Sequence, residues 1–257
     1  MIKALLHKKL KNSFENPEFK PSEDSLTSSV IGLLQYLPNE KFWCLLKNSC
    51  GNLSSFKQKP GELISIEFWK KFQADKKYNS TYVEPDVYCE FENINVIIEA
   101  KKEDAIEQQY SEQWEKEITS YFMEQNIENS KELIFIALGG NKSLKNKTID
   151  IKKKKHNIYM SSWQRLLSEV EKYRDSLTKR EKYSSSELRI LTDTIHVFEK
   201  HNYFCLNWLD EIVKCDFSKD AFDIINNWSF DNKPLLSSIL NSSINYKIST
   251  DFNTFSL

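Results

Sequence analysis

Two acidic residues and one lysine, placed in two neighbouring segments, are the residues of this chain best suited to catalysis. Asp86 lies within segment 82–91, and Glu99 and Lys101 lie at the end of segment 94–101. If the two segments form a β-hairpin around a two-residue turn, Asp86 lies opposite Glu99. Because side chains alternate between the two faces of a strand, Lys101 shares the face of Glu99.

The hydrophobic pattern favours this hairpin register, because it makes one face entirely apolar. The apolar pairs are Val87 with Ile98, Cys89 with Val96, and Phe91 with Ile94. The β-carbons of directly opposed residues lie about 4.5–5.5 Å apart, and two carboxylates at that separation repel each other without a compensating cation. A hard divalent ion with oxygen ligands, Mg²⁺ or Mn²⁺, suits such a pair. Together with Lys101, this ion would be suited to metal-assisted hydrolysis of a phosphodiester bond.

These residues resemble the motif of the PD-(D/E)XK nuclease superfamily, the fold shared by many restriction and repair nucleases. Its parts are met by Pro85-Asp86 and by Glu99-Ala100-Lys101, which are separated by a hairpin as the family requires. The resemblance implies that Asp86 and Glu99 hold Mg²⁺, with help from the carbonyl of Ala100. It also implies that Lys101 positions the attacking water.

Two further residues are suggested by the same resemblance. Many members add an acidic residue from the first helix, and Glu23 fits that position, so the resemblance implies that Glu23 also holds the metal ion. Many also place a glutamine on the helix that follows the second motif, for which we choose Gln113, with Gln108 and Gln109 as alternatives. The tyrosine often found four residues after that glutamine is replaced here by Glu117, which is a departure from the family pattern.

Each of these assignments has a purely structural alternative. The motif carboxylates and Lys101 could form a salt-bridge cluster on a half-exposed hairpin. Glu23 could simply complement the dipole of its helix, and Gln113 could be an ordinary solvated helix residue. The apolar neighbours Ile97 and Ile98 favour the functional interpretation, because a charge on a buried strand is costly unless it is used.

The periodicity of apolar residues predicts the elements that position the motif. A helix should begin after the N-cap residue Ser22 and end before Pro38. The segment 41–47 is compatible with a helix or an extended stretch. Further predicted elements are strands in 62–72, 82–91, 95–100, 133–138 and 158–160, and helices in 104–125 and 162–173. This order predicts an α/β fold, a restriction-endonuclease-like mixed β-sheet core flanked by helices.

The resemblance covers about residues 20–175, so we expect a nuclease-like domain in 1–180. Residues 181–257 are expected to form a helical C-terminal extension, either separate or packed on the same domain. The lysine-rich segment 142–155 is interpreted as a loop that either contacts phosphates or is merely solvated.

Composition limits the remaining possibilities. The chain has 257 residues with 40% hydrophobic residues and a net charge of −1, which predicts a folded protein rather than a disordered one. No segment has the ~18 apolar residues needed to span a bilayer, and no secretory signal is visible, so we expect a cytoplasmic protein without membrane contact. Five cysteines without a CxxC spacing fit a reducing compartment. No Gly-rich nucleotide motif occurs, so an ATP-driven step would need another chain.

The sequence therefore predicts a Mg²⁺-dependent endo- or exonuclease, with Mn²⁺ as a substitute ion. DNA is the expected substrate by resemblance, since no residue excludes RNA, and restriction or antiphage defence is the expected role. A homodimer, or a partner protein that supplies ATPase or sensing function, is compatible with the sequence. The alternative is a catalytically silent nuclease-like subunit that binds DNA or serves assembly in a complex.

Overall fold

The computed structural model describes residues 21–51, 59–125, 131–151, 153–179 and 185–204. They belong to the first of two compact units, Met1–Cys205. The helices of this part are α2 (Glu23–Leu34), α3 (Asn39–Ser49), α4 (Ser111–Glu124), α5 (Trp163–Thr178) and α6 (Ser186–Lys200). The strands are β1 (Leu63–Phe68), β2 (Phe72–Gln73), β3 (Tyr82–Val83), β4 (Val87–Phe91), β5 (Ile94–Ala100), β6 (Glu132–Leu138), β7 (Lys147–Ile151) and β8 (Lys154–Ser161).

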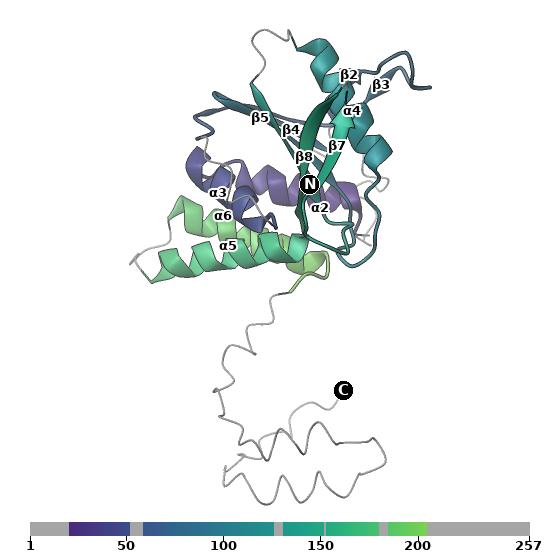
Figure 1. The fold of residues 1–257 in the computed structure, drawn as a ribbon. Helices are drawn as coiled ribbons and strands as arrows, with labels where there is room; N and C mark the ends of the chain where they lie inside the picture. Colours follow the sequence, from purple (N-terminus) through teal and green to yellow (C-terminus); the bar gives the residue numbers. More distant parts are fainter. Residues whose placement is uncertain (1–20, 52–58, 126–130, 152, 180–184, 205–257) are drawn as a thin grey trace, which may run out of the picture. The chain divides into compact units, whose positions relative to one another are not determined.

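A mixed six-stranded sheet forms the centre of this unit (Figure 1). Its strand order is β1-β4-β5-β6-β8-β7, while β2 and β3 form a separate two-stranded sheet. The pairs β1–β4, β4–β5 and β7–β8 are antiparallel, whereas β5–β6 and β6–β8 are parallel. The predicted mixed α/β sheet flanked by helices is therefore confirmed.

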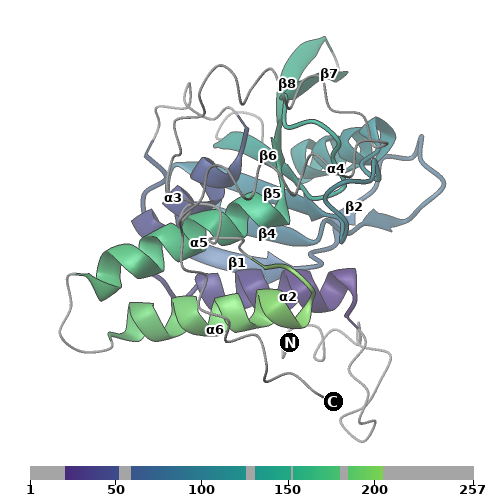
Figure 2. The same cartoon turned by 90° about the horizontal axis from the view of Figure 1, so that it is seen from below.

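Helices cover both faces of this sheet, but unequally. Helices α2, α3, α5 and α6 pack on one face, and α4 packs on the other together with the β2–β3 ribbon (Figures 1 and 2). The four-helix face contributes residues such as Val87, Val96 and Ile98 to a large apolar core. The α4 face forms a second core, in which Trp114 and Ile118 of the helix join strand residues.

The hairpin of β4 and β5 has the predicted register. Val87 pairs with Ile98, and Cys89 pairs with Val96, so the alternation of apolar residues identified both faces correctly. The predicted strand 82–91 is nevertheless wrong in its first half. Residues Tyr82–Val83 pair with β2 instead, because Pro85 has no N–H group to continue the ladder of the central sheet.

Three other element predictions need correction. Segment 62–72 is not one strand, because β1 ends before Trp69, which has a left-handed φ of 52°. The helix predicted for 104–125 begins only at Ser111. The lysine-rich segment 142–155 is not simply a loop, because it contains β7 and the start of β8, whose lysines are exposed at the edge of the sheet.

The structure also confirms the predicted N-cap of the first helix and decides the conformation of segment 41–47. Ser22 caps α2, since its side chain accepts a hydrogen bond from the backbone N–H of Ser25 while the Ser25 side chain bonds the Ser22 backbone. This capping box satisfies orphan N–H groups at the start of the helix. The segment 41–47, left open by its pattern, is helical and belongs to α3.

Helix α6 packs against α2 and α5, and the first compact unit extends to Cys205. The sequence-based boundary at residue 180 thus does not coincide with the boundary between the two compact units. The helical prediction for 205–257 lies outside the described residues. In the described part of the chain, no helix combines the length and the apolar character required to traverse a bilayer.

Candidate active site

Asp86 and Glu99 are brought together where β4 begins and β5 ends. Both are buried, with 7% and 2% of their surface exposed. The carboxylate of Asp86 accepts a hydrogen bond of 2.8 Å from the backbone N–H of Ala100 and one of 3.2 Å from the indole of Trp69. The predicted carboxylate pair therefore lies at the interior end of the hairpin and not on a solvated surface.

Lys101, the residue after β5, reaches back over this pair. Its ammonium group donates to Glu99 Oε1 and to the carbonyl of Ala100, the latter at 3.0 Å. It also lies 3.4 Å from Glu23 Oε1. The Lys101 backbone is fixed as well, because its carbonyl accepts a 2.8 Å hydrogen bond from the indole of Trp163. A lysine restrained at both its backbone and its ammonium group is well placed to act on a bound reactant.

Glu23 enters the site from the first turn of α2. Besides its contact with Lys101, its Oε2 accepts a 3.1 Å hydrogen bond from the backbone N–H of Lys102. A role at the start of the helix dipole and a role in the site are both compatible with this position. Residues predicted from distant parts of the sequence thus meet at one place.

The three candidate glutamines have different positions. Gln113, in the first turn of α4, donates a 2.7 Å hydrogen bond to Glu99 Oε1. Gln109 is buried and bonds the Glu99 backbone carbonyl at 3.0 Å and the indole of Trp114 at 2.9 Å. The Gln108 backbone N–H bonds the Gly140 carbonyl. Of the three, only the side chain of Gln113 has a hydrogen bond to a motif carboxylate among the described residues.

Glu117 is a further site residue that sequence reasoning did not assign. It is wholly buried, and Glu99, Gln113 and Asp86 are its polar neighbours. Neither of its carboxylate oxygens has a hydrogen bond of good geometry to any described residue. The sequence signal was available, because residues four apart lie on the same helix face and Glu117 follows Gln113 by four.

The electrostatics of the site reflect this concentration of acids. Burial, followed by the charge of Glu99, raises the pKa of Asp86 well above its usual value. Burial and the neighbouring Glu117 likewise raise the pKa of Glu99. The pKa of Glu117 is raised to about 8, first by burial and then by Asp86. Burial disfavours the ammonium form of Lys101, but Glu99 and the other acids outweigh it and raise the pKa of Lys101. The carboxyl groups of the site therefore hold protons more strongly than isolated carboxyl groups would.

Two consecutive glycines after β6 allow the chain there to pack closely against Lys101. Gly139 and Gly140 have left-handed φ angles of 71° and 65°. A β-carbon at Gly139 would lie 2.1 Å from the Lys101 carbonyl oxygen, and one at Gly140 would lie 2.7 Å from the Lys101 β-carbon. Lys101 therefore packs directly against these two glycines, where a side chain would displace it.

The donor set of the site fits a hard divalent ion in its chemistry. The carboxylates of Asp86, Glu99 and Glu117 and the carbonyl of Ala100 are oxygen donors, the type that Mg²⁺ and Mn²⁺ prefer. The buried oxygens of Glu117 adjoin Gln113 and Glu99 but make no hydrogen bond of good geometry to a described residue. However, no group of three or more Asp, Glu, His or Cys side chains in the described part is arranged to hold a metal ion. Lys101 itself occupies Glu99 and the Ala100 carbonyl, so an ion would compete with its ammonium group.

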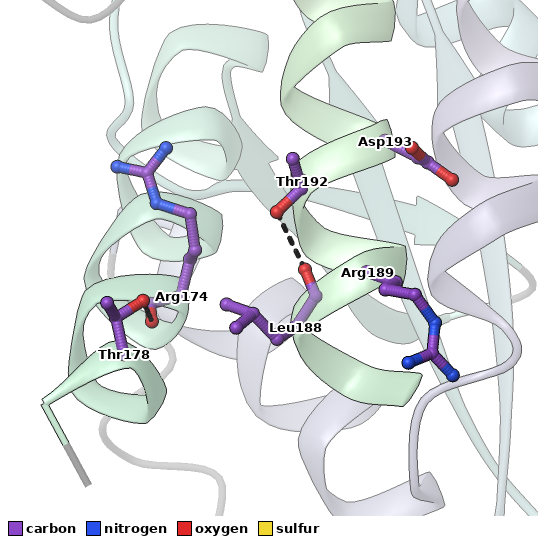
Figure 3. A pocket seen from close by; sticks show the side chains of 6 residues that line it. All are labelled: Arg174, Thr178, Leu188, Arg189, Thr192 and Asp193. Atoms are coloured by element: carbon purple, nitrogen blue, oxygen red, sulfur yellow. Dashed lines mark hydrogen bonds between the residues drawn. The ribbon is translucent and has the colours of Figure 1, made fainter. Parts of the chain in front are cut away.

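A separate cavity of about 360 Å³ lies between α5 and α6 (Figure 3). None of the candidate site residues lines it. Its arginines, Arg174 and Arg189, point away from each other (Figure 3), and Arg174 pairs with Asp175. The hydroxyl of Thr192 bonds the carbonyl of its own helix at Leu188. The cavity therefore lacks converging polar groups, and we assign it no chemistry.

Comparison with known proteins establishes a family but no activity. No family model matches the chain, and no solved structure matches it. A protein of Pasteurella multocida (strain Pm70), named as uncharacterized, is 31% identical over 238 residues, which cover 84% of this chain and 86% of the relative. The chain therefore belongs to the same family as this Pasteurella protein.

Proposed function

We propose that the protein is a metal-dependent nuclease of the PD-(D/E)XK type that hydrolyses phosphodiester bonds. One observation carries this proposal: Asp86, Glu99 and Lys101 meet at the interior end of a hairpin, at the spacing that the family motif requires. Isolated buried charges are costly, so a buried cluster of acids and a lysine indicates a functional site.

The arrangement of elements supports the same proposal. The helix α2, the antiparallel strands β1, β4 and β5, the helix α4 and the parallel strand β6 follow one another in the order expected for a restriction-endonuclease-like core. Glu23 from α2 and Gln113 from α4 reach the motif residues, as the resemblance implies. The proposal of a restriction-endonuclease-like fold, rather than only a mixed α/β fold, rests on this order of elements and on these two contacts.

In the proposed reaction, Asp86, Glu99 and the Ala100 carbonyl would hold Mg²⁺ or Mn²⁺, with Glu23 nearby. The bound ion would supply Lewis-acid activation of the phosphoryl group and of water. Lys101 would orient the attacking water and stabilise negative charge that develops on the phosphoryl oxygens. Gln113 would hold the Glu99 carboxylate in place through its 2.7 Å hydrogen bond.

We further propose DNA as the substrate, in a cytoplasmic setting such as restriction or antiphage defence, on the basis of the family resemblance. The exposed lysines of the β7–β8 hairpin, among them Lys153, Lys154 and Lys155, could bind the phosphate backbone. Such binding would weaken steeply with salt.

The test is a cleavage assay with plasmid, linear duplex and single-stranded DNA in Mg²⁺ or Mn²⁺. Asp86→Ala and Lys101→Ala should abolish cutting while the circular dichroism spectrum stays native. The matched controls are Asp150→Ala and Lys102→Ala: Asp150 is exposed on β7, and the Lys102 side chain pairs only with Glu103 among the described residues. Both controls should cut normally.

Cutting that survives both site substitutions would exclude this site as the catalytic one. The absence of cutting on every DNA substrate would favour a DNA-binding or assembly subunit instead. Cutting in EDTA would exclude the metal-dependent mechanism.

A further inference from the structure

The end of α6 lies against the candidate site, although it is outside residues 20–175, which carry the nuclease resemblance. Helix α6 packs beside α2 (Figure 2), and its C-terminal end contacts the first turn of α2, which carries Glu23. The helix ends at Lys200, with His201 as its C-cap. The next residue, Asn202, has a left-handed φ of 65°, a conformation that asparagine tolerates better than most residues.

The chain reverses its direction at Asn202. The backbone N–H of Tyr203 donates a 2.9 Å hydrogen bond to the Phe198 carbonyl, and that of Asn202 donates one of 3.0 Å to the Glu199 carbonyl. These two bonds are those of the Schellman motif, which commonly ends a helix. The rings of Phe198 and Tyr203 also pack edge to face, with their centroids 6.1 Å apart. Backbone and ring contacts therefore fix the direction in which the Tyr203 side chain leaves the helix.

Tyr203 and Glu23 hold the same residue of the site from two different helices. The hydroxyl of Tyr203 donates to the backbone carbonyl of Lys102, while the backbone N–H of Lys102 donates a 3.1 Å hydrogen bond to Glu23 Oε2. Both backbone polar groups of Lys102 are thus bonded to side chains. Because Lys102 directly follows Lys101 in the chain, these bonds restrain the backbone from which the Lys101 side chain extends.

His201 connects the same helix end to the start of α2. Its side chain is buried, with 4% of the residue exposed. Its Nδ1 donates a 2.8 Å hydrogen bond to the Val197 carbonyl, because a carbonyl oxygen can only accept. Its Nε2 lies 2.8 Å from the hydroxyl of Ser25, which belongs to the capping box of α2 and follows Glu23 by two residues. The end of α6 therefore also fixes the helix turn that carries Glu23.

We propose that Tyr203 and His201 are positioning residues of the candidate site. They hold the Lys102 backbone and the first turn of α2, so that Lys101 and Glu23 meet in one geometry. This inference rests on the proposed nuclease function and adds to it two residues that lie outside the resemblance. It also implies that an active domain requires α6 and does not end near residue 180.

The experiment compares Tyr203→Phe with a matched control, Tyr173→Phe, in the full chain. Tyr203→Phe removes the hydroxyl that bonds Lys102 and keeps the ring that packs on Phe198. Tyr173→Phe removes a hydroxyl that bonds Glu187, in the first turn of α6, so it deletes a comparable contact at the other end of the helix. The two variants should therefore have similar melting temperatures.

Cleavage of DNA in Mg²⁺ should distinguish the two variants. Tyr203→Phe should lower kcat by roughly tenfold with KM within about twofold of the wild type, because a small misplacement of a catalytic group can cost on the order of 100-fold. Tyr173→Phe should cut like the wild type. A purely structural role of Tyr203 would give equal losses in both variants.

A second readout requires neither DNA nor a metal ion. It is the hydrogen exchange rate of the Lys102 backbone amide, measured by NMR, because this amide bonds Glu23. Tyr203→Phe should speed the exchange about fivefold, the factor to which one typical net hydrogen bond corresponds. Tyr173→Phe should leave it unchanged.

His201 is tested by a pair of variants that differ in their ability to bond Ser25. The amide of His201→Gln can reach the Ser25 hydroxyl, whereas His201→Leu fills the space without a polar atom. His201→Leu should slow cleavage and speed the exchange of the Lys102 amide, and His201→Gln should restore most of both. Equal behaviour of the two variants would overturn the assignment of His201.

The outcomes separate this inference from the proposed function. If the wild type cuts DNA and Tyr203→Phe cuts at the same rate, the nuclease stands and the positioning role falls. If the wild type cuts no DNA, the proposed nuclease falls and the exchange of the Lys102 amide decides the positioning role. Faster exchange in Tyr203→Phe alone would then support it, and unchanged exchange would overturn it.

Discussion

The two faces of the central sheet bury different kinds of side chain. The face beneath α2, α3, α5 and α6 presents aliphatic residues such as Val96 and Ile98. The buried carboxylates of the described residues, Asp86, Glu99 and Glu117, adjoin the side covered by α4. Adjacent positions of one strand, such as Ile98 and Glu99, can thus be an ordinary core residue and a buried acid, because alternation turns them to opposite faces. The comparison teaches that one face buries an apolar core alone, while the other buries an apolar core together with acids, at a cost in stability.

The largest effect is expected from placing an acid on the apolar face. Ile98 is wholly buried, and Ile98→Glu should cost more than about 5 kcal/mol, comparable to the total stability of many domains. We expect no cooperative thermal unfolding, measured by circular dichroism. Ile98→Val is the control, with an expected cost of about 0.5–1.5 kcal/mol. A cooperative melt of Ile98→Glu near the wild-type temperature would contradict the distinction between the two faces.

The α4 face should show the opposite behaviour: removal of a buried acid from this face should increase the stability of the protein. The pKa of Glu117 is raised from 4.5 to about 8, so the folded, metal-free protein keeps a proton that the unfolded chain releases. The stability that this retained proton contributes is fully present below about pH 4.5. It is lost as the pH rises towards 8, by at most about 1.4 kcal/mol per pH unit.

Glu117→Gln should therefore be less sensitive to pH than the wild type over this range, and more stable at pH 8. Urea unfolding of the metal-free proteins at pH 5, 6.5 and 8 measures the difference. Parallel pH profiles of the two proteins would show that Glu117 does not titrate in this way.

A smaller effect is expected where backbone geometry supports the site. Gly139→Ala places a β-carbon 2.1 Å from the Lys101 carbonyl at a φ of 71°, and should destabilise the protein by more than about 1 kcal/mol. Gly32→Ala in α2, which meets no atom closer than 4.0 Å, should instead stabilise it by roughly 0.5–1 kcal/mol. Urea unfolding measures both, and changes of the same sign would contradict this contrast.

The smallest effect concerns competition for Glu99. Lys101→Met removes the ammonium group that bonds Glu99 and the Ala100 carbonyl, so Mn²⁺ should bind roughly threefold or more tightly, about 0.7 kcal/mol. The same variant should not cut DNA. Isothermal calorimetry measures the affinity, with Lys102→Met as the control. Weaker Mn²⁺ binding by Lys101→Met would show that the ammonium group assists the ion rather than competes with it.

Much of the hairpin was predictable from sequence because alternation has a single solution there. Only one register makes a face of β4 and β5 entirely apolar, and it fixes the position of Glu99 relative to Asp86. The start of α2 was predictable because Ser22 is a strong N-cap residue. These signals are local or depend on one strand pair, so no knowledge of distant contacts was required.

The remaining errors have equally specific causes. Helix α4 begins at Ser111, where Tyr110 makes no side-chain cap, so the charged residues before it gave no boundary signal. The β7–β8 hairpin is rich in exposed lysines, which interrupt the alternation of apolar and polar residues that would predict a strand. Glu117 was noted only as a departure from the expected tyrosine, because the burial of a helix face depends on the sheet packed against it.

The most direct measurement of the central claim is anomalous diffraction from a crystal soaked in Mn²⁺. The account predicts an anomalous peak in contact with the carboxylates of Asp86 and Glu99, with the Lys101 ammonium group displaced from Glu99. If no peak appears there at Mn²⁺ concentrations far above physiological, or if manganese binds only to exposed acids elsewhere, the buried carboxylates are not a metal site and the proposed nuclease mechanism is contradicted.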